Sequence, residues 1–216
     1  MLAGSRIVSL TVVAKIPVTT SSSGNEHEST ADHSELDPLT GALTRQTFFL
    51  RLIEQATLAN STGQPFSICL ADADQLKNIN HLHGQQAGDE ALSQVTRRIR
   101  QTLADAFPDT QEPVLGRCDG NGFVLLIPNC ELEQASGIAE NYRRAIATLE
   151  MSKGVRITVS VGVSQYQLWE SAEETLARAE QALHLAKQFG RDRVEVAATP
   201  RSTNTTAKVI PLRRTA

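Results

Sequence analysis

The stretch Arg117-Cys-Asp-Gly-Asn-Gly-Phe-Val-Leu-Leu-Ile-Pro128 decides the fold of this 216-residue chain. Asp-Gly and Asn-Gly are the dipeptides that best tolerate the positive φ angles of a tight hairpin turn. An apolar run follows the turn, and Val114-Leu115 lies just before it. The segment therefore predicts two antiparallel strands joined by a short turn.

Working outward from the hairpin, segments with helical and strand patterns alternate along the chain. Apolar residues recur at helical spacing over residues 44–60, 86–103, 132–150 and 172–189, and a further helix is expected from Gln75. Buried or alternating strands are expected over residues 66–71, 155–163 and 193–196. Because one hairpin interrupts the alternation, the pattern predicts an α/β fold of the α+β sandwich type, a central mixed sheet flanked by helices.

Composition divides the chain into three parts. Residues 1–36 predict a disordered leader and an acidic linker, because residues 18–36 carry four acids and no Lys or Arg. Residues 37–196 form the folded domain, and 40% hydrophobic content is enough for one core. Residues 197–216 carry four basic residues and no acid, which predicts a disordered basic tail with a solvated charge.

Charge and apolar content exclude some classes of partner. A net charge of -3 and a pI near 6.0 give no overall attraction to nucleic acid. The apolar run over residues 7–14 is too short to span a bilayer. The cysteines Cys69, Cys118 and Cys130 lack CxxC or metal-ligand spacing, which favours reduced, buried thiols. We therefore expect a cytoplasmic protein without a membrane span.

Two carboxylates stand at the end of the first predicted strand, in Ala71-Asp-Ala-Asp74. Open α/β sheets place ligands at the carboxyl ends of strands, and hard carboxylate oxygens there suit Mg²⁺ with a phosphate substrate. Aspartate also caps helices, and the helix from Gln75 needs a cap. These residues alone leave metal binding and capping equally open, with Asp72 the better ligand and Asp74 the better cap.

Further motifs follow in a fixed order around this pair. They are Asp37-Pro-Leu-Thr-Gly-Ala-Leu-Thr-Arg45, Asp72-Ala-Asp-Gln-Leu-Lys-Asn-Ile-Asn80, Gly88-Asp-Glu-Ala-Leu92, Thr158-Val-Ser-Val-Gly-Val163 and Ala179-Glu-Gln-Ala-Leu-His-Leu-Ala-Lys-Gln-Phe-Gly-Arg-Asp-Arg-Val194. In this order and at these separations, the set resembles the GGDEF family of diguanylate cyclases from Asp37 to Val196. The resemblance implies a palm-like domain in which two GTP-loaded copies face each other, hence a homodimer, to make cyclic di-GMP.

The resemblance also implies roles for individual residues. Asp72 would hold Mg²⁺, and the backbone after it would help. An Asn and a carboxylate suit guanine, which offers both N–H donors and acceptor atoms on its edge. The positions that would contact the nucleotide are Lys77, Lys187 and Arg191 for the phosphates and Asn80 and Asp89 for the guanine. Taken without the resemblance, the lysines are ordinary surface charges, and Asn80 and Asp89 are ordinary cap residues.

The family pattern at the hairpin is Arg-x-Gly-Gly-Asp/Glu-Glu-Phe, and this chain departs from it at three positions. Gly120 is kept as a substrate-binding glycine. Asn121 replaces the acid that resembles a general base, and Gly122 replaces a metal-binding carboxylate. Asp119 replaces a glycine, which we expect to add a negative charge beside the phosphates. The hairpin is retained, and its catalytic groups are absent.

These departures leave three functions to be distinguished. The first is a catalytically degenerate GGDEF domain that acts as a regulatory or interaction module, with GTP and a weakly held Mg²⁺ as candidate ligands and a protein partner that the sequence does not identify. The second is an active diguanylate cyclase with a rearranged metal site. The third is a protein-interaction scaffold without nucleotide binding. We favour the first, because a scaffold has no evident need for the surviving set of candidate binding residues.

Overall fold

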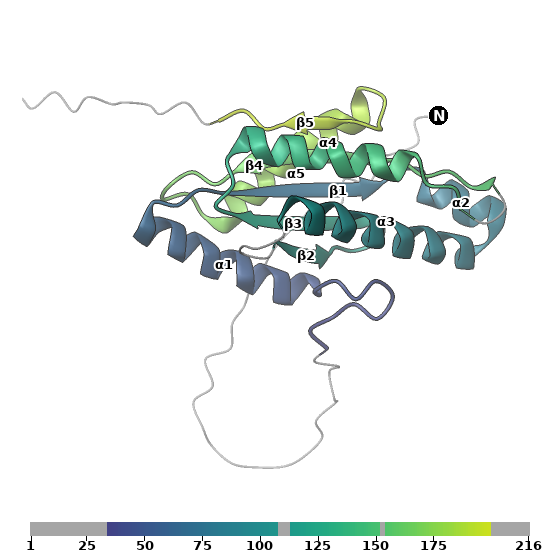
Figure 1. Ribbon diagram of the computed structural model, residues 1–216, viewed down its shortest axis with the longest axis horizontal. Coiled ribbons are helices and arrows are strands. Elements are labelled where there is room, and N and C mark those ends of the chain that lie inside the picture. Colours follow the sequence, from purple (N-terminus) through teal and green to yellow (C-terminus); the bar gives the residue numbers. More distant parts are fainter. Residues whose placement is uncertain (1–33, 108–112, 152–153, 200–216) are drawn as a thin grey trace, which may run out of the picture.

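One mixed five-stranded sheet forms the centre of the domain (Figure 1). The computed structural model describes residues 34–107, 113–151 and 154–199. The strands follow the order β2 (Val114–Arg117), β3 (Gly122–Pro128), β1 (Phe66–Ala73), β4 (Val159–Gln165) and β5 (Val194–Val196). All neighbouring pairs are antiparallel except β4 and β5, which are parallel. The predicted mixed sheet and its hairpin are therefore confirmed.

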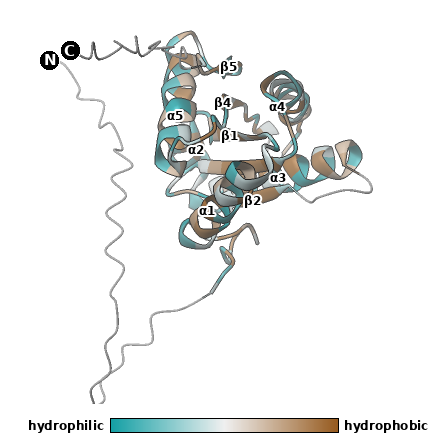
Figure 2. Ribbon diagram, turned by 90° about the vertical axis from the view of Figure 1, so that its left-hand side faces the viewer, coloured by the Kyte–Doolittle hydropathy of each residue, from teal (hydrophilic) through white to brown (hydrophobic). Residues whose placement is uncertain are grey.

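Helices cover both faces of this sheet. Four long helices belong to the sandwich, namely α1 (Arg45–Thr62), α3 (Gln85–Ala106), α4 (Leu132–Ala147) and α5 (Ala172–Gln188). Buried residues of α3 and α4 share one hydrophobic cluster with the strands, and those of α1 and α5 share the other. Figure 2 shows the sheet between α5 on one side and α4 on the other. The short helix α2 (Leu76–His83) follows β1 directly.

The central strand β1 is buried on both faces. Cys69, Ala71 and Ala73 belong to the cluster beneath α3 and α4, whereas Ile68 and Leu70 belong to the cluster beneath α1 and α5. Successive side chains of a strand point to opposite faces. Asp72, the next residue of this alternation, therefore lies on the face covered by α5.

The ends of two helices follow from ordinary capping chemistry. Thr44 precedes α1 and accepts a hydrogen bond from the Thr47 amide, while Gly63 ends the helix with a φ of 72°. Ser171 and Glu174 form a capping box at the start of α5. These local signals place both helices where the sequence pattern predicts them.

Several boundaries differ from the sequence-based expectation. The strand expected over residues 155–163 is β4, which begins only at Val159, and the apolar residues Val155 and Ile157 are buried in the loop that leads into it. The three cysteines are free and not exposed, as expected, and burial raises the pKa of the Cys130 thiol to about 11. Residues 1–33 of the predicted leader and linker and residues 200–216 of the predicted tail lie outside the described residues. Among the helices that the structure describes, none has the length and apolarity needed to cross a membrane.

Helix α5 lies unusually close to β4 at Gly162. A Cβ atom built on this glycine would lie 2.1 Å from the Ala179 carbonyl oxygen and 2.3 Å from the Leu183 amide nitrogen. Both neighbours are backbone atoms of α5, so no side-chain rotation can make room. The helix can rest on the strand only because residue 162 has no side chain.

We therefore predict that Gly162→Ala lowers the free energy of unfolding by about 3 kcal/mol or more, because the new methyl group must push α5 away from the sheet. The matched control is Gly137→Ala on α4, where an added Cβ meets no atom within 4 Å. That change should raise stability by about 0.5–1 kcal/mol, since alanine favours a helix interior over glycine. Urea unfolding of both variants tests the close approach, and equal effects would contradict it.

Candidate functional site

The candidate site lies where β1 ends, β3 begins and the C-terminal part of α5 passes over the sheet. Asp72 of β1 pairs directly with Gly122 of β3 in the antiparallel ladder. Asn121, the residue before Gly122 in the hairpin turn, places its side chain beside Asp72 and donates a hydrogen bond to it. The pairing therefore brings the strand carboxylate and the altered signature into contact.

The Asp72 carboxylate is satisfied from two directions. Its Oδ2 atom lies 2.8 Å from the Nζ atom of Lys187 on α5. Its Oδ1 atom accepts a hydrogen bond of 2.6 Å from the Asn121 side-chain amide. Burial raises the pKa of the Asp72 carboxyl above its ordinary value, and the Lys187 ammonium and the Asn121 amide act against this rise. Both candidate residues thus serve to stabilise Asp72 as an anion.

Asn121 also closes the hairpin against β1. Its Nδ2 atom donates a second hydrogen bond of 2.8 Å to the Ala73 carbonyl oxygen. The backbone carbonyl of Asn121 accepts a hydrogen bond of 3.0 Å from the Ala73 backbone amide. One amide nitrogen therefore lies between the Asp72 carboxylate and the following backbone carbonyl. These are the two acceptors that the sequence assigned to Mg²⁺.

The acceptor set does not suit a divalent cation in this arrangement. Mg²⁺ requires octahedral oxygen ligands at about 2.0–2.1 Å. Here three acceptor positions already face N–H donors, and Gly122 supplies no ligand. No group of three or more metal-binding side chains exists among residues 34–107, 113–151 and 154–199. Mg²⁺ binding at Asp72 thus stays a prediction that this hydrogen bonding does not favour.

Asp74 has a different role from the one predicted for it. It does not cap α2, since the residue at the cap position is Gln75, with a φ of 55° and no side-chain cap bond. Asp74 is instead buried, and its two carboxylate oxygens accept 2.7 Å hydrogen bonds from the Thr158 and Ser160 hydroxyls. The Asp192 amide donates a third bond at 3.2 Å. Asp74 therefore joins the end of β1, the start of β4 and the turn after α5.

That turn carries Arg191 in a constrained backbone conformation. Gly190, Arg191 and Asp192 all have positive φ angles, of 114°, 65° and 45°. Positive φ is costly for residues other than glycine, so surrounding contacts must hold this turn in place. Besides Asp74, Arg143 of α4 provides such a contact, donating to the Asp192 carboxylate at 2.5 Å. Arg191 itself is exposed near the site.

Helices α2 and α3 present the predicted guanine-binding residues. The Asn80 Oδ1 atom is buried and has no hydrogen-bond partner among the described residues. A Cβ atom at Gly88 would lie only 1.8 Å from this oxygen. Position 88, in the first turn of α3, must therefore be glycine for Asn80 to lie where it does. Asp89 follows in the same turn, and Lys77 is exposed on α2. The structure thus brings Asn80 against the first turn of α3, in which Asp89 lies, and leaves the Asn80 Oδ1 atom without a partner among the described residues.

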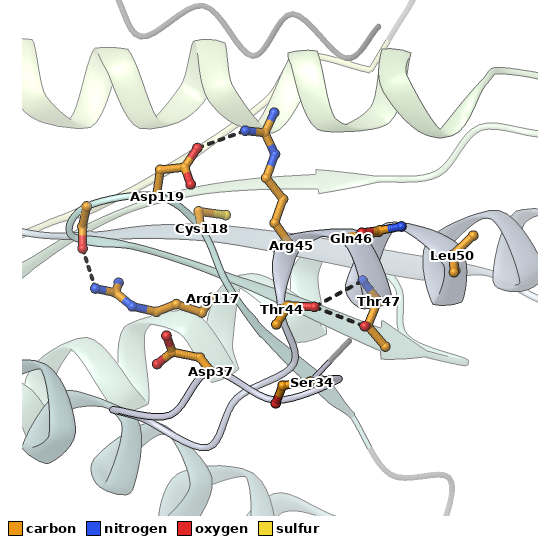
Figure 3. A pocket seen from close by; sticks show the side chains of 11 residues that line it. Ser34, Asp37, Thr44, Arg45, Gln46, Thr47, Leu50, Arg117, Cys118 and Asp119 are labelled. Carbon is orange, nitrogen blue, oxygen red and sulfur yellow. Dashed lines mark hydrogen bonds and ion pairs between the residues drawn. The ribbon is translucent and has the colours of Figure 1, made fainter. Parts of the chain in front are cut away.

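The exposed side chain of Asp119 faces the start of α1, and the expectation that it adds charge beside the phosphates stays a prediction. Its carboxylate pairs with Arg45 at 2.8 Å, and 76% of its side chain is exposed (Figure 3). The pair borders a hollow of about 750 Å³ between the hairpin and the start of α1. On the same side, Arg117 donates to the Gly120 and Gly122 carbonyls and lies over the Phe123 ring. Gly120 has a φ of 70°, so it serves the turn.

The arrangement agrees with a known domain family. The family model described as diguanylate cyclase, GGDEF domain, matches residues 34–193. This chain belongs to the GGDEF family. Its fold and its site residues can now be compared with relatives of that family.

Curated relatives are about one third identical to this GGDEF domain over the aligned residues. Diguanylate cyclase DgcM of Escherichia coli is 34% identical over 159 residues, which cover 73% of this chain and 37% of DgcM. Diguanylate cyclase DgcP of Pseudomonas aeruginosa is 34% identical over 184 residues, which cover 80% of this chain and 26% of DgcP. The chain therefore spans well under half the length of these relatives.

Solved structures show the same fold. Diguanylate cyclase SiaD of P. aeruginosa, solved in complex with its activator SiaC, has a TM-score of 0.70 and 32% identity over 76% of this chain and 62% of that one. The GGDEF domain of DgcB from Caulobacter crescentus, solved in complex with c-di-GMP, has a TM-score of 0.71 over 82% of this chain and all of that one. Its identity is 23%, so this second likeness shows the fold alone. The palm-like architecture predicted from sequence is confirmed.

Sequence reasoning missed the residues that support this GGDEF site from α4. Arg143 donates to both carboxylate oxygens of Glu140 at 2.8 Å as well as to Asp192. The only sequence signal was Glu140 three residues before Arg143, a spacing that is common on exposed helices. Nothing in that spacing indicates that the pair extends to a turn 49 residues away.

The Glu140–Arg143 pair predicts a pH dependence of stability. Hydrogen bonds from Arg143, assisted by Arg144, lower the pKa of the Glu140 carboxyl from 4.5 to about 2. Such a shift would correspond to about 3 kcal/mol in a fully buried pair, and solvent screening reduces our expectation to about 1–2 kcal/mol. Because the folded-state pKa is lowered, this stabilisation is present above pH 4.5 and is lost as the pH falls toward 2.

Replacing Glu140 by Gln should therefore lower stability at pH 7 and flatten the decrease between about pH 5 and pH 2. The control is Glu133→Gln on the same helix, where the carboxylate is exposed. Urea unfolding across this pH range measures both. An unchanged pH profile in the Glu140 variant would show that the pair does not contribute.

Proposed function

We propose that this GGDEF domain is catalytically degenerate and acts as a regulatory or interaction module in cyclic di-GMP-related signalling, binding GTP without converting it. The observation that carries the proposal is the hydrogen bond of 2.6 Å from the Asn121 amide to Asp72. At the position where the family has an acid, this chain has a donor that is already committed to the remaining carboxylate. A neutral amide can neither accept the 3′-hydroxyl proton nor neutralise the charge of a metal ion.

The expected loss of rate is large. Absence of a general base typically costs about 10²- to 10⁴-fold. A weakened metal clamp removes several kcal/mol of transition-state stabilisation, which is on the order of 10²-fold or more. The two losses arise from adjacent positions, Asn121 and Gly122. Together they would bring cyclisation below a useful rate while leaving the fold intact.

Nucleotide binding is supported by the groups that remain. Asn80 offers a buried Oδ1 acceptor without a partner, and such an atom is costly unless a ligand supplies a donor. Guanine carries N1–H and N2–H donors that suit Asn80 and the Asp89 carboxylate. Lys77 and Arg191 are exposed cations near the same end of the sheet and suit a phosphate chain. These features favour GTP binding over the pure scaffold.

The proposal also covers the protein partner, the cellular location and the oligomeric state of the domain. SiaD forms a complex with an activator protein, and a catalytically degenerate domain would likewise act through a protein partner. We propose a cytoplasmic location, since GTP is the ligand, and a homodimer as in the face-to-face arrangement of the family. The alternative of an active cyclase is distinguished by the activity test below.

Incubated with GTP and Mg²⁺, the protein should form no cyclic di-GMP above a control without protein. The double change Asn121→Asp and Gly122→Glu should produce detectable synthesis, because it returns two carboxylates beside Asp72. Adding Asp119→Gly should change little, since Asp119 pairs with Arg45 on the outer side of the hairpin. Product formation is measured by chromatography.

Gly122→Ala is the control for crowding, since a Cβ at this position lies 3.1 Å from the Cys118 Cβ and requires a small shift. It should fold and remain inactive. Accumulation of cyclic di-GMP by the unaltered protein over many turnovers would contradict the proposed degeneracy. A repaired protein that folds and binds GTP but yields no product would show that the defect extends beyond the hairpin.

The guanine contacts predict selectivity for GTP over ATP. Adenine would leave Asn80 and Asp89 without hydrogen-bond donors. We therefore expect the affinity for GTP to be at least about tenfold higher than the affinity for ATP. Asp89→Ala should reduce this preference, whereas Asp105→Ala at the exposed far end of the same helix should not. Calorimetric titration with each nucleotide measures the ratio. Absence of binding, or equal affinity for both, would favour the scaffold.

A further inference from the structure

The Asn121 amide and the Lys187 ammonium occupy the same acceptors that a cation would need. We propose that this domain binds the phosphates of its nucleotide without a divalent cation, because these two groups supply the compensation for Asp72 that Mg²⁺ would otherwise give. This inference rests on the proposed nucleotide binding. It assigns a binding role to Asn121, which stabilises Asp72 by a hydrogen bond where the family has an acid.

The hydrogen-bond distances support this assignment. The Asn121 Nδ2 atom lies 2.6 Å from Asp72 Oδ1 and 2.8 Å from the Ala73 carbonyl oxygen, and Lys187 Nζ lies 2.8 Å from Asp72 Oδ2. A cation entering between Asp72 and Ala73 would have to break both amide hydrogen bonds. It would also compete with Lys187, which already neutralises the same carboxylate.

The absence of the two signature acids at positions 121 and 122 agrees with a site that needs no cation. With acids at both positions 121 and 122, three carboxylates would converge on the end of β1, and like charges that close require a cation. In this chain Asn121 and Lys187 both contact the Asp72 carboxylate, and the neighbouring Asp74 carboxylate accepts hydrogen bonds from two hydroxyls and one backbone amide. The Lys187 ammonium formally neutralises Asp72, so this carboxylate does not need Mg²⁺ as its counter-ion.

Cationic side chains would then bind the phosphates directly. Lys187 has three N–H donors and uses one on Asp72, and its side chain is 34% exposed. Lys77 and Arg191 are exposed at the same end of the domain. The ligand class that fits is a guanine nucleotide as its free phosphate anion, recognised by Lys and Arg donors.

The first test uses Mg²⁺ alone and requires no nucleotide. The midpoint of thermal unfolding of the unaltered protein should be the same in EDTA and in millimolar MgCl₂ at equal ionic strength. Asn121→Asp should unfold at a lower temperature in EDTA, by about 4 °C or more, and recover in MgCl₂, because the new carboxylate faces Asp72. Asn141→Asp, an exposed amide on α4, is the matched control and should not respond to Mg²⁺. A Mg²⁺-insensitive Asn121→Asp variant would overturn the assignment.

The second test uses the unaltered protein, so it does not depend on the folding of a variant. GTP titrated in EDTA should bind within about threefold of its affinity in MgCl₂, or more tightly. An affinity that rises tenfold or more with Mg²⁺ would overturn the cation-free site while leaving the proposed nucleotide binding intact. Absence of GTP binding under both conditions would instead overturn the proposed function on which this inference rests.

Discussion

Two aspartates at the end of a strand buried on both faces constrain the whole surrounding structure. A carboxylate removed from water must be satisfied by hydrogen bonds or counter-charges, or it destabilises the fold. Asp74 is satisfied by two hydroxyls and one amide, and Asp72 by an ammonium and an amide. The contacts made by this pair join β1 to β3, β4, α5 and the turn after α5. The positions of the candidate binding residues follow from these contacts.

Although Asn121 and Gly122 replace the signature acids, each oxygen of the Asp72 carboxylate has a partner. An aspartate or glutamate at position 121 would face Asp72 as a second anion, whereas Asn121 is a neutral donor of similar shape. The exchange removes the acid that the family resemblance would make the general base, and it adds a hydrogen bond at the same place. The proposed loss of catalysis would therefore not require a loosened site, because the hydrogen bonds of Asn121 hold the hairpin against β1.

Much of the fold followed from local signals in the sequence. Asp-Gly-Asn-Gly predicted the hairpin, in which Gly120 has a positive φ of 70°, and the helical spacing of apolar residues predicted α5. The site residues were proposed from motif order, and their roles stay predictions. Contacts between distant segments were not predictable. The direction of Asp119 depends on Arg45, and the burial of Asp74 depends on hydroxyls in β4, so neither could be inferred from neighbouring residues.

Gly162 has a consequence for how the cationic side of the site is positioned. Because α5 rests on β4 through backbone atoms, there is no deformable layer of side chains between them at that point. The height of the helix above the sheet is therefore set by van der Waals contact between backbone atoms. Lys187 lies about one helical turn beyond Leu183, so the same contact determines its height above the sheet. Substitutions on the outer surface of α5 should therefore leave the Lys187 ammonium group in place beside Asp72.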